Sequence, residues 1–309
     1  MRESCEKYFG TIDEMLDQSY GLASNNKVMG AIAGCLDVPE NEIANIQLIK
    51  RGMTNRSFTF ECGGMKYIMR IPGEGTGDII DRKAEYDNYQ AVLKYGISDE
   101  VVYFDPESGY KITRYLEGAT SCDPGHVPSV KACMEKLRGF HELKLTVGHS
   151  FDPFERIEFY EALRSSPRSC FGDYQSTKAN VMKLKGYIES TEKEWVMAHI
   201  DAVPDNFIFT CGGRIVLLDW EYSGMQDPHI DIAMFSVYSG YDKHRVDAVM
   251  DMYFGEGCPD NIRKKIYAYV AVCGLLWSNW CEFKRQKGAR FGGYALKQYR
   301  YAKDFYRYV

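Results

Sequence analysis

The sequence predicts an α+β protein of two lobes, a small β-rich N-terminal lobe followed by a mainly helical C-terminal lobe. Two observations carry this prediction. Between residues 46 and 116, polar and apolar residues alternate in short runs bounded by glycine-rich turns, which is typical of strands. From residue 117 to residue 309, apolar residues recur mostly at helical spacing, and only one short hairpin pattern interrupts them. Residues 1–45 are expected to form an N-terminal helical extension.

Composition and charge narrow the class of protein. The 309 residues are 45% hydrophobic and 26% charged, which suits one two-lobed enzyme or two compact domains. A net charge of -5 argues against a nucleic-acid partner, because phosphate backbones favour basic surfaces. The 10 cysteines form no Cys-x-x-Cys pair, which predicts a reducing cytoplasm. Because the charged first residues lack the apolar stretch of a signal peptide and the apolar run at residues 271–277 is too short to span a bilayer, we expect a cytoplasmic protein without a membrane partner.

The N-terminal part is predicted to begin with a helix and continue as a small sheet. Residues 10–36 carry apolar side chains at helical spacing, and residues 46–51 look like a strand. Two alternating runs flank Gly63-Gly64 and predict a β-hairpin. A helix over residues 80–95 ends at Gly96. Two further strand patterns, 101–104 and 110–115, flank a turn sequence and predict a second hairpin.

The C-terminal part is predicted to be helical around one hairpin. Residues 206–210 and 214–219 alternate on either side of Cys211-Gly-Gly213, as in a tight hairpin. The expected helices are one marked by Val130, Met134, Leu137 and His141, and those over 155–165, 176–190, 244–254 and 261–285. A hinge is expected near residues 113–118.

The chemistry is predicted from one motif. His199-Ile-Asp201-Ala-Val-Pro-Asp-Asn206 fits H-x-D-x-x-x-x-N, and Asp219-Trp-Glu221 follows at the end of a strand. This order of an Asp base, an Asn ligand and a second Asp ligand is that of phosphoryl-transfer loops. The hairpin after Asn206 explains how Asn206 and Asp219 meet at one metal.

The residue types suit a phosphoryl transfer that uses ATP and Mg²⁺. Magnesium prefers hard oxygen ligands, which Asn206 and Asp219 supply; Glu221 is a further candidate for metal or substrate. Asp201 is expected to orient an acceptor hydroxyl and accept its proton. His199 is expected to brace the loop without taking protons itself.

With these motifs, the sequence resembles the choline kinase and aminoglycoside phosphotransferase superfamily, and within it the bacterial choline kinases of the LicA type. The segment from Leu218 to Met234 is very similar to their second motif, Gly52 to Phe58 resembles their phosphate loop, and Trp277-Ser-Asn-Trp280 resembles their W-x-x-W substrate motif. The resemblance starts near residue 46. It implies a protein-kinase-like fold and phosphorylation of choline by ATP.

The resemblance also implies a nucleotide site. Gly52, Thr54 and Asn55 would hold phosphate through backbone N–H groups and short polar side chains. Lys66 and Arg70 lie four apart, on one face of a strand. The resemblance favours Arg70 as the phosphate-binding cation, with Glu85 as its helix partner. The backbone at Arg114 and Leu116 would hold the adenine.

The expected acceptor is choline or a similar amino alcohol. Trp277 and Trp280 would provide aromatic faces for a quaternary ammonium, with Tyr222 and Tyr294 as further walls and Asp201 or Glu221 as negative charge. Three alternatives stay open: a kinase for ethanolamine or another amino alcohol, an aminoglycoside-type antibiotic phosphotransferase, and an inactive kinase-like binding protein. The intact set of Asp201, Asn206 and Asp219 argues against the last.

Overall fold

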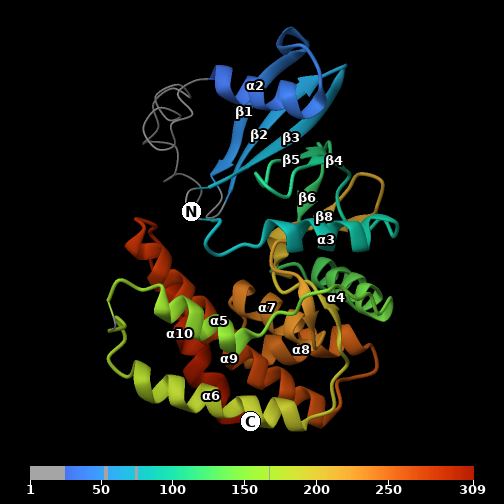
Figure 1. The fold of residues 1–309 in the computed structure, drawn as a ribbon. Coiled ribbons are helices and arrows are strands. Elements are labelled where there is room, and N and C mark those ends of the chain that lie inside the picture. Colours follow the sequence, from blue (N-terminus) through green and yellow to red (C-terminus); the bar gives the residue numbers. More distant parts are fainter. Residues whose placement is uncertain (1–24, 52–54, 74–75, 167) are drawn as a thin grey trace. The chain divides into compact units, whose positions relative to one another are not determined.

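The computed structural model describes residues 25–51, 55–73, 76–166 and 168–309, which divide into two compact units (Figure 1). The N-terminal unit contains the described residues up to Tyr86 together with Asp99–Glu117, and the C-terminal unit contains Asp87–Ser98 and Gly118–Val309. The first is rich in strands and the second in helices, so the predicted α+β class is confirmed. The division at residues 45 and 116 stays a prediction.

The N-terminal unit is built on a five-stranded antiparallel sheet in the order β1-β2-β3-β5-β4. Its strands are β1 (Ile43–Arg51), β2 (Asn55–Cys62), β3 (Met65–Pro72), β4 (Val101–Phe104) and β5 (Lys111–Arg114). Strands β2 and β3 pair from Cys62↔Met65 to Asn55↔Pro72. The turn between them uses Gly63 at φ 58° and Gly64 at φ 74°, a conformation that glycine adopts without strain. Both predicted hairpins are therefore confirmed.

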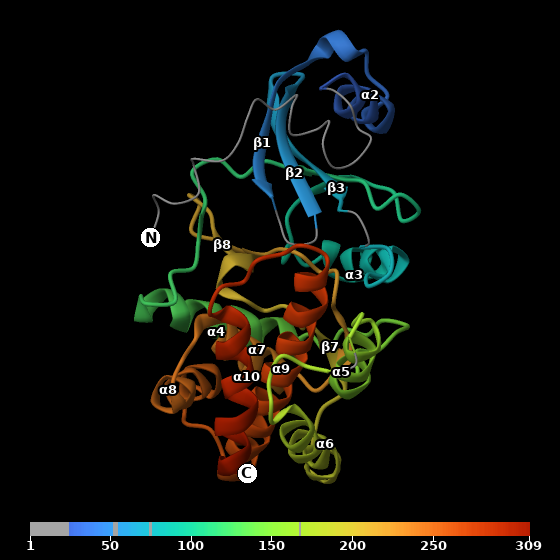
Figure 2. The same cartoon turned by 90° about the vertical axis from the view of Figure 1, so that its left-hand side faces the viewer.

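Helix α2 (Asn25–Leu36) packs against this sheet and closes its core, and Figure 2 shows it beside β1, β2 and β3. Val28 and Ile32 from the helix are buried with Phe58, Phe60 and Met69 from the strands. Full burial of such a side chain contributes roughly 1.5–3 kcal/mol. Residues 10–24 of the predicted helix lie outside the described residues. A 3-10 turn (Glu40–Glu42) leads into β1, and helix α3 (Arg82–Leu93) follows β3, close to its predicted bounds.

The C-terminal unit packs its helices around α9, most of whose residues from Lys265 to Lys284 are buried. Helices α5, α6, α7 and α10 all contact α9, and Figure 2 shows α10 running beside it. The helices are α4 (Val127–Glu142), α5 (Pro153–Ala162), α6 (Tyr174–Ser190), α7 (His229–Ser239), α8 (Lys243–Phe254), α9 (Asp260–Gln286) and α10 (Tyr294–Phe305), followed by a 3-10 turn (Tyr306–Tyr308).

Short strands in this unit position the loops that carry the motif. They are β6 (Thr120–Ser121), β7 (Val196–Ala198), β8 (Phe207–Phe209), β9 (Ile215–Leu217) and β10 (Gly224–Gln226). Strands β6, β8 and β9 form one sheet, and β7 pairs with β10 in another. The predicted hairpin is the β8–β9 pair, in the register Phe207↔Leu217.

The sequence predicted α4, α5, α6, α8 and α9 but not α7 or α10. All eight residues from Ile230 to Val237 are buried, and all except Asp231 are apolar or small. Helix α7 therefore has no polar face, and its sequence shows no amphipathic helical period. Helix α10 is rich in tyrosine and basic residues, which obscure its apolar stripe. Among the described helices, none combines the length and hydropathy needed to cross a bilayer.

Candidate functional site

The predicted catalytic loop lies between β7 and β8. Asn206 sits in a 3-10 turn (Pro204–Asn206), and its Nδ2 donates to the backbone oxygen of Asp201 at 2.9 Å and to Asp201 Oδ2 at 3.1 Å. The β8–β9 hairpin brings the chain back to Asn206, where the backbone N–H of Leu218 donates to Asn206 O at 2.9 Å. Asp219 therefore follows directly after a residue tied to Asn206, and the structure brings these predicted residues together.

The backbone is strained beside both acidic residues. Ile200, just before Asp201, has φ 69°, and Asp219 has φ 63°. Positive φ is unfavourable for side chains other than glycine, especially β-branched ones. Such strain persists only where neighbouring contacts fix the backbone, and it is frequent at functional sites.

Asp231, on α7, supplies the contacts that fix the loop at Ile200. Its carboxylate accepts the backbone N–H groups of His199 and Ile200, both at 2.7 Å. It also lies 2.9 Å from Nε2 of His141, whose Nδ1 lies 2.8 Å from the Tyr253 hydroxyl. Asp231 is fully buried, so these partners compensate its desolvation. Sequence reasoning missed this role, since nothing local links residues 199 and 231.

His199 links the loop to the segment that carries Asp219. It is fully buried, and its Nε2 donates to the backbone oxygen of Leu218 at 2.9 Å. Its ring packs against Trp220 at 4.6 Å between centroids. Burial lowers the pKa of His199 to about 4, although the charge of Asp231 opposes this. The imidazole is therefore neutral near pH 7, which suits a structural role rather than proton transfer.

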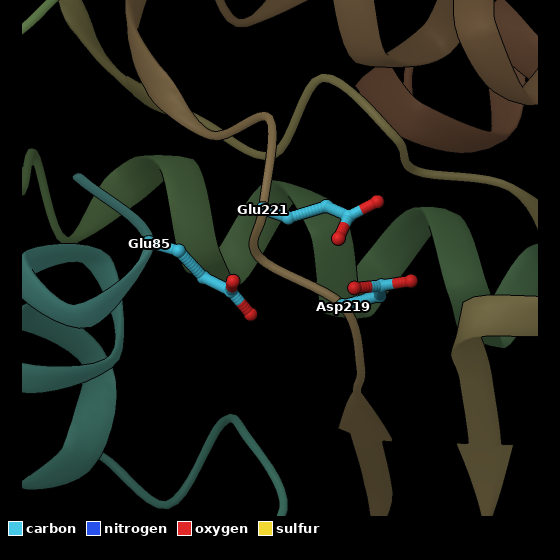
Figure 3. A group of neighbouring side chains, drawn as sticks. All are labelled: Glu85, Asp219 and Glu221. Atoms are coloured by element: carbon cyan, nitrogen blue, oxygen red, sulfur yellow. The ribbon is translucent and has the colours of Figure 1, made fainter. Parts of the chain in front are cut away.

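Asp219 and Glu221 place two carboxylates next to each other (Figure 3). Their oxygens lie within 4.8 Å of one another. Glu85, also labelled in that view, belongs to the N-terminal unit. Asn88 holds the segment that carries Asp219 and Glu221. Its Nδ2 donates to the backbone oxygens of Trp220 at 3.0 Å and Ser223 at 2.9 Å. The pair offers the hard oxygen ligands that Mg²⁺ prefers.

These carboxylates change the proton affinity of Asp201. Burial raises the pKa of Asp201 well above its usual range, and the negative charges of Asp219 and Glu221 raise it further. The hydrogen bond from Asn206 acts in the opposite direction. A carboxylate with a raised pKa is a better proton acceptor.

In the N-terminal unit, the cationic side chains of Arg70, Arg82 and Lys111 surround Glu85. Arg70 contacts Glu85 through both guanidinium ends, one at 3.0 Å, and also donates to Gly109 O at 3.2 Å. Arg82 lies 2.6 Å and Lys111 3.8 Å from the same carboxylate. Burial alone would raise the pKa of Glu85, but Arg70, Lys111 and Arg82 lower it to about 2. Sequence reasoning identified Arg70 and Glu85 and missed Lys111 and Arg82.

The remaining predicted nucleotide-site residues are placed as follows. Asn55 Oδ1 accepts from Arg82 at 3.0 Å, whereas Gly52 and Thr54 lie outside the described residues. The Arg114 N–H is already used by Glu100 O at 2.9 Å, and the N–H of Tyr115 by Lys66 O at 3.0 Å. Leu116, next in the chain, is half-buried at the end of the unit.

An aromatic series in the C-terminal unit contains the predicted acceptor residues. Trp277 and Trp280 on α9 contact at 5.7 Å between centroids, with their rings nearly perpendicular. Tyr222 contacts Trp277 at 5.8 Å, and Phe291 lies between Trp280, at 5.4 Å, and Tyr294, at 6.5 Å. The structure thus joins all four predicted aromatic residues, through Phe291, which sequence reasoning missed. The shared helix face of the two tryptophans is confirmed.

The sequence prediction that Arg70 binds a phosphate of ATP is tested by Arg70→Ala, which should raise the KM for ATP by roughly tenfold or more, because a hydrogen bond to a charged group contributes about 1.5–3 kcal/mol. Lys66→Ala is the matched control, since Lys66 lies on the same strand and its Nζ lies 4.4 Å from the centre of the Tyr115 ring. Steady-state kinetics with varied ATP, and thermal unfolding of each variant, check this. A raised KM in Lys66→Ala alone would instead assign the phosphate to Lys66.

An antiparallel sheet with a buried Arg–Glu pair, together with a helical unit carrying Asp201, Asn206 and Asp219, defines the class of kinase-like phosphotransferases. The family model for choline/ethanolamine kinase matches residues 46–252. Protein LicA of Haemophilus influenzae is 26% identical over 259 residues, covering 80% of this chain and 76% of its own.

Two solved structures of similar fold support the same classification. The crystal structure of the choline kinase LicA from Streptococcus pneumoniae is 27% identical with a TM-score of 0.78, and the match covers 91% of this chain and 98% of that one. A structure of LicA in complex with AMP has the same identity and TM-score, and covers 93% and 100%. The chain belongs to the choline/ethanolamine kinase family, with the expected protein-kinase-like fold. It is an ATP-dependent phosphotransferase that acts on an alcohol.

Proposed function

We propose that this protein is a choline kinase, which transfers the γ-phosphate of ATP to the hydroxyl group of choline. The observation that supports this most is the aromatic series from Tyr222 through Trp277 and Trp280 to Tyr294, in the same unit as the catalytic loop. Methyl groups on a quaternary nitrogen donate no conventional hydrogen bonds, so aromatic faces and negative charge are what recognises it. Similarity to the LicA proteins supports the same acceptor.

Asp201 is proposed to hold the choline hydroxyl and to accept its proton. Asn206 fixes the Asp201 carboxylate through Nδ2, and Asp231 fixes the backbone before it. A carboxylate held by two such contacts is oriented before the substrate arrives, which lowers the cost of reaching the reactive geometry.

Magnesium fits the oxygen donors present, and we propose that Asn206, Asp219 and Glu221 hold it. Because Nδ2 of Asn206 serves Asp201, its amide oxygen is the atom that remains to bind a cation. Bound magnesium would neutralise charge on the phosphate oxygens of ATP. Arg70, positioned by Glu85, is proposed to contact a phosphate of ATP. The scattered cysteines, which are free among the described residues, support a cytoplasmic site of action.

Replacing the tryptophans should weaken choline binding selectively. Trp280→Ala and Trp277→Ala should each raise the KM for choline about tenfold, because a cation–π contact contributes roughly 0.5–2 kcal/mol. The KM for ATP should change little. Trp195→Ala is the control, since Trp195 is 51% exposed and outside the aromatic series.

A neutral analogue tests the charge itself. 3,3-Dimethylbutan-1-ol has the shape of choline with carbon in place of the nitrogen, and the wild type should phosphorylate it poorly. Equal efficiency with this alcohol and with choline would show that the pocket does not recognise an ammonium. Ethanolamine in the same series decides between the two acceptors of the family name.

A further inference from the structure

Two lysines of the C-terminal unit, Lys265 and Lys284, are buried among the described residues, and Lys284 lies beside a predicted acceptor residue. Lys284 lies in the last turn of α9, four residues after Trp280, and is 7% exposed. Residues four apart lie on the same helix face. Its Nζ lies 5.9 Å from the centre of the Trp280 ring, which is within the range of a cation–π contact. The lysine therefore directs its ammonium to the tryptophan proposed to receive choline.

Lys265, also buried on α9, has the polar partners that Lys284 lacks among the described residues. Lys265 Nζ forms an ion pair with Asp227 at 2.6 Å and donates to the backbone oxygen of Glu192 at 2.7 Å. Among the residues that the structure describes, Lys284 Nζ has neither an ion pair nor a hydrogen bond. Buried lysines are normally paired, because an unpaired charge loses its hydration.

The charge of a candidate site residue also acts on Lys284. Burial lowers the pKa of Lys284, and the charge of Glu221 opposes this. The sequence makes Glu221 a candidate for binding the metal or for supplying negative charge to the acceptor, so a predicted site residue acts electrostatically on Lys284. A substrate ammonium placed against the Trp280 ring would share that ring, and the charge of Glu221, with Lys284.

We propose that Lys284 is a specificity-determining residue of the proposed acceptor site, whose ammonium competes with the substrate's ammonium for the Trp280 ring and offsets the negative charge of Glu221. This inference rests on the proposed function. Lys284 reduces the affinity for any acceptor with a fixed positive charge, and it reduces it more for acceptors with several, such as aminoglycosides. It leaves neutral acceptors of the same shape unaffected.

Lys284→Met keeps the length and apolar stem of the side chain and removes its charge. This variant should lower the KM for choline about three- to tenfold, since the lysine ammonium no longer occupies the Trp280 ring or repels the charge of the substrate. Its KM for ATP and its kcat/KM for 3,3-dimethylbutan-1-ol should stay within twofold of wild type. Lys284→Arg, which keeps the charge, should retain the wild-type KM for choline.

Lys287→Met is the matched control, because Lys287 is an exposed lysine three residues further along the chain. It makes the same change in net charge and should leave the KM for choline unaltered. An unchanged or raised KM for choline in Lys284→Met would overturn the proposal. So would an equal change for the neutral alcohol, which would indicate altered shape rather than charge. Thermal unfolding checks the fold, and Lys284→Gln replaces Lys284→Met if the latter does not fold.

The two hypotheses fail in different ways. If the wild type phosphorylates no ammonium alcohol, the proposed function is wrong. The role of Lys284 is then decided by calorimetric titration of tetramethylammonium into the wild type and Lys284→Met. Tighter binding to the variant supports competition at Trp280, whereas equal or weaker binding overturns it.

Discussion

Asp201→Asn should reduce turnover by about 10²–10⁴-fold, the range that a positioned general base typically contributes. The substitution keeps the size of the side chain and removes its ability to accept a proton. Affinity for nucleotide should change little, because Asp201 is proposed to contact the acceptor hydroxyl and not ATP. Steady-state turnover and calorimetric titration of ATP with magnesium measure the two effects separately.

The control for this substitution is Asp205→Asn in the same loop. Asp205 is exposed, and its carboxylate accepts a hydrogen bond from the Tyr238 hydroxyl at 2.8 Å. That variant should retain turnover within a factor of about three, as for most surface substitutions. If Asp201→Asn were equally active, Asp201 would have no part in the proton transfer.

Asp219→Asn should weaken magnesium-dependent nucleotide binding by at least about a hundredfold, since even residues that only support a metal ligand cost 10–100-fold when lost. Asn is preferred to Ala here because Asp219 has φ 63°, a conformation that Asn tolerates better. A loss in Asp219→Asn then reflects the missing charge rather than a strained backbone.

Asn206→Ala should weaken the same binding less, because it removes a neutral ligand and not a charged one. It should also reduce turnover, since Asn206 holds Asp201. Titration with ATP at several magnesium concentrations distinguishes the two variants. Unaltered magnesium dependence in Asp219→Asn would place the metal elsewhere.

The fold could be predicted where local patterns dominate. The β2–β3 and β8–β9 hairpins follow from alternating residues around Gly63-Gly64 and Gly212-Gly213, because turn chemistry and side-chain period act over a few residues. Helix α7 could not be found this way. Its residues are buried on nearly all sides by α8 and α9, so the period that marks an amphipathic helix is missing.

The site residues could likewise be predicted only where a local sequence pattern marks them. The motif residues Asp201, Asn206 and Asp219 were recognisable because a short hairpin connects them. Asp231 was not, because its carboxylate accepts the N–H groups of His199 and Ile200 across the fold. Lys284 was not, although it lies only four residues after Trp280, because neither its burial nor its lack of a polar partner among the described residues can be read from the sequence. Charge type and helical spacing are visible in a sequence, whereas the absence of a partner is visible only in three dimensions.

Product analysis tests the central claim most directly. Wild-type protein, ATP, magnesium and choline should yield phosphocholine and ADP in equal amounts, detected by phosphorus NMR and mass spectrometry. Omitting choline should stop ADP formation, and Asp201→Asn should form product at least about a hundred times more slowly. ADP released at the same rate without choline, or no phosphocholine after complete turnover of ATP, would contradict the proposal that this enzyme phosphorylates choline.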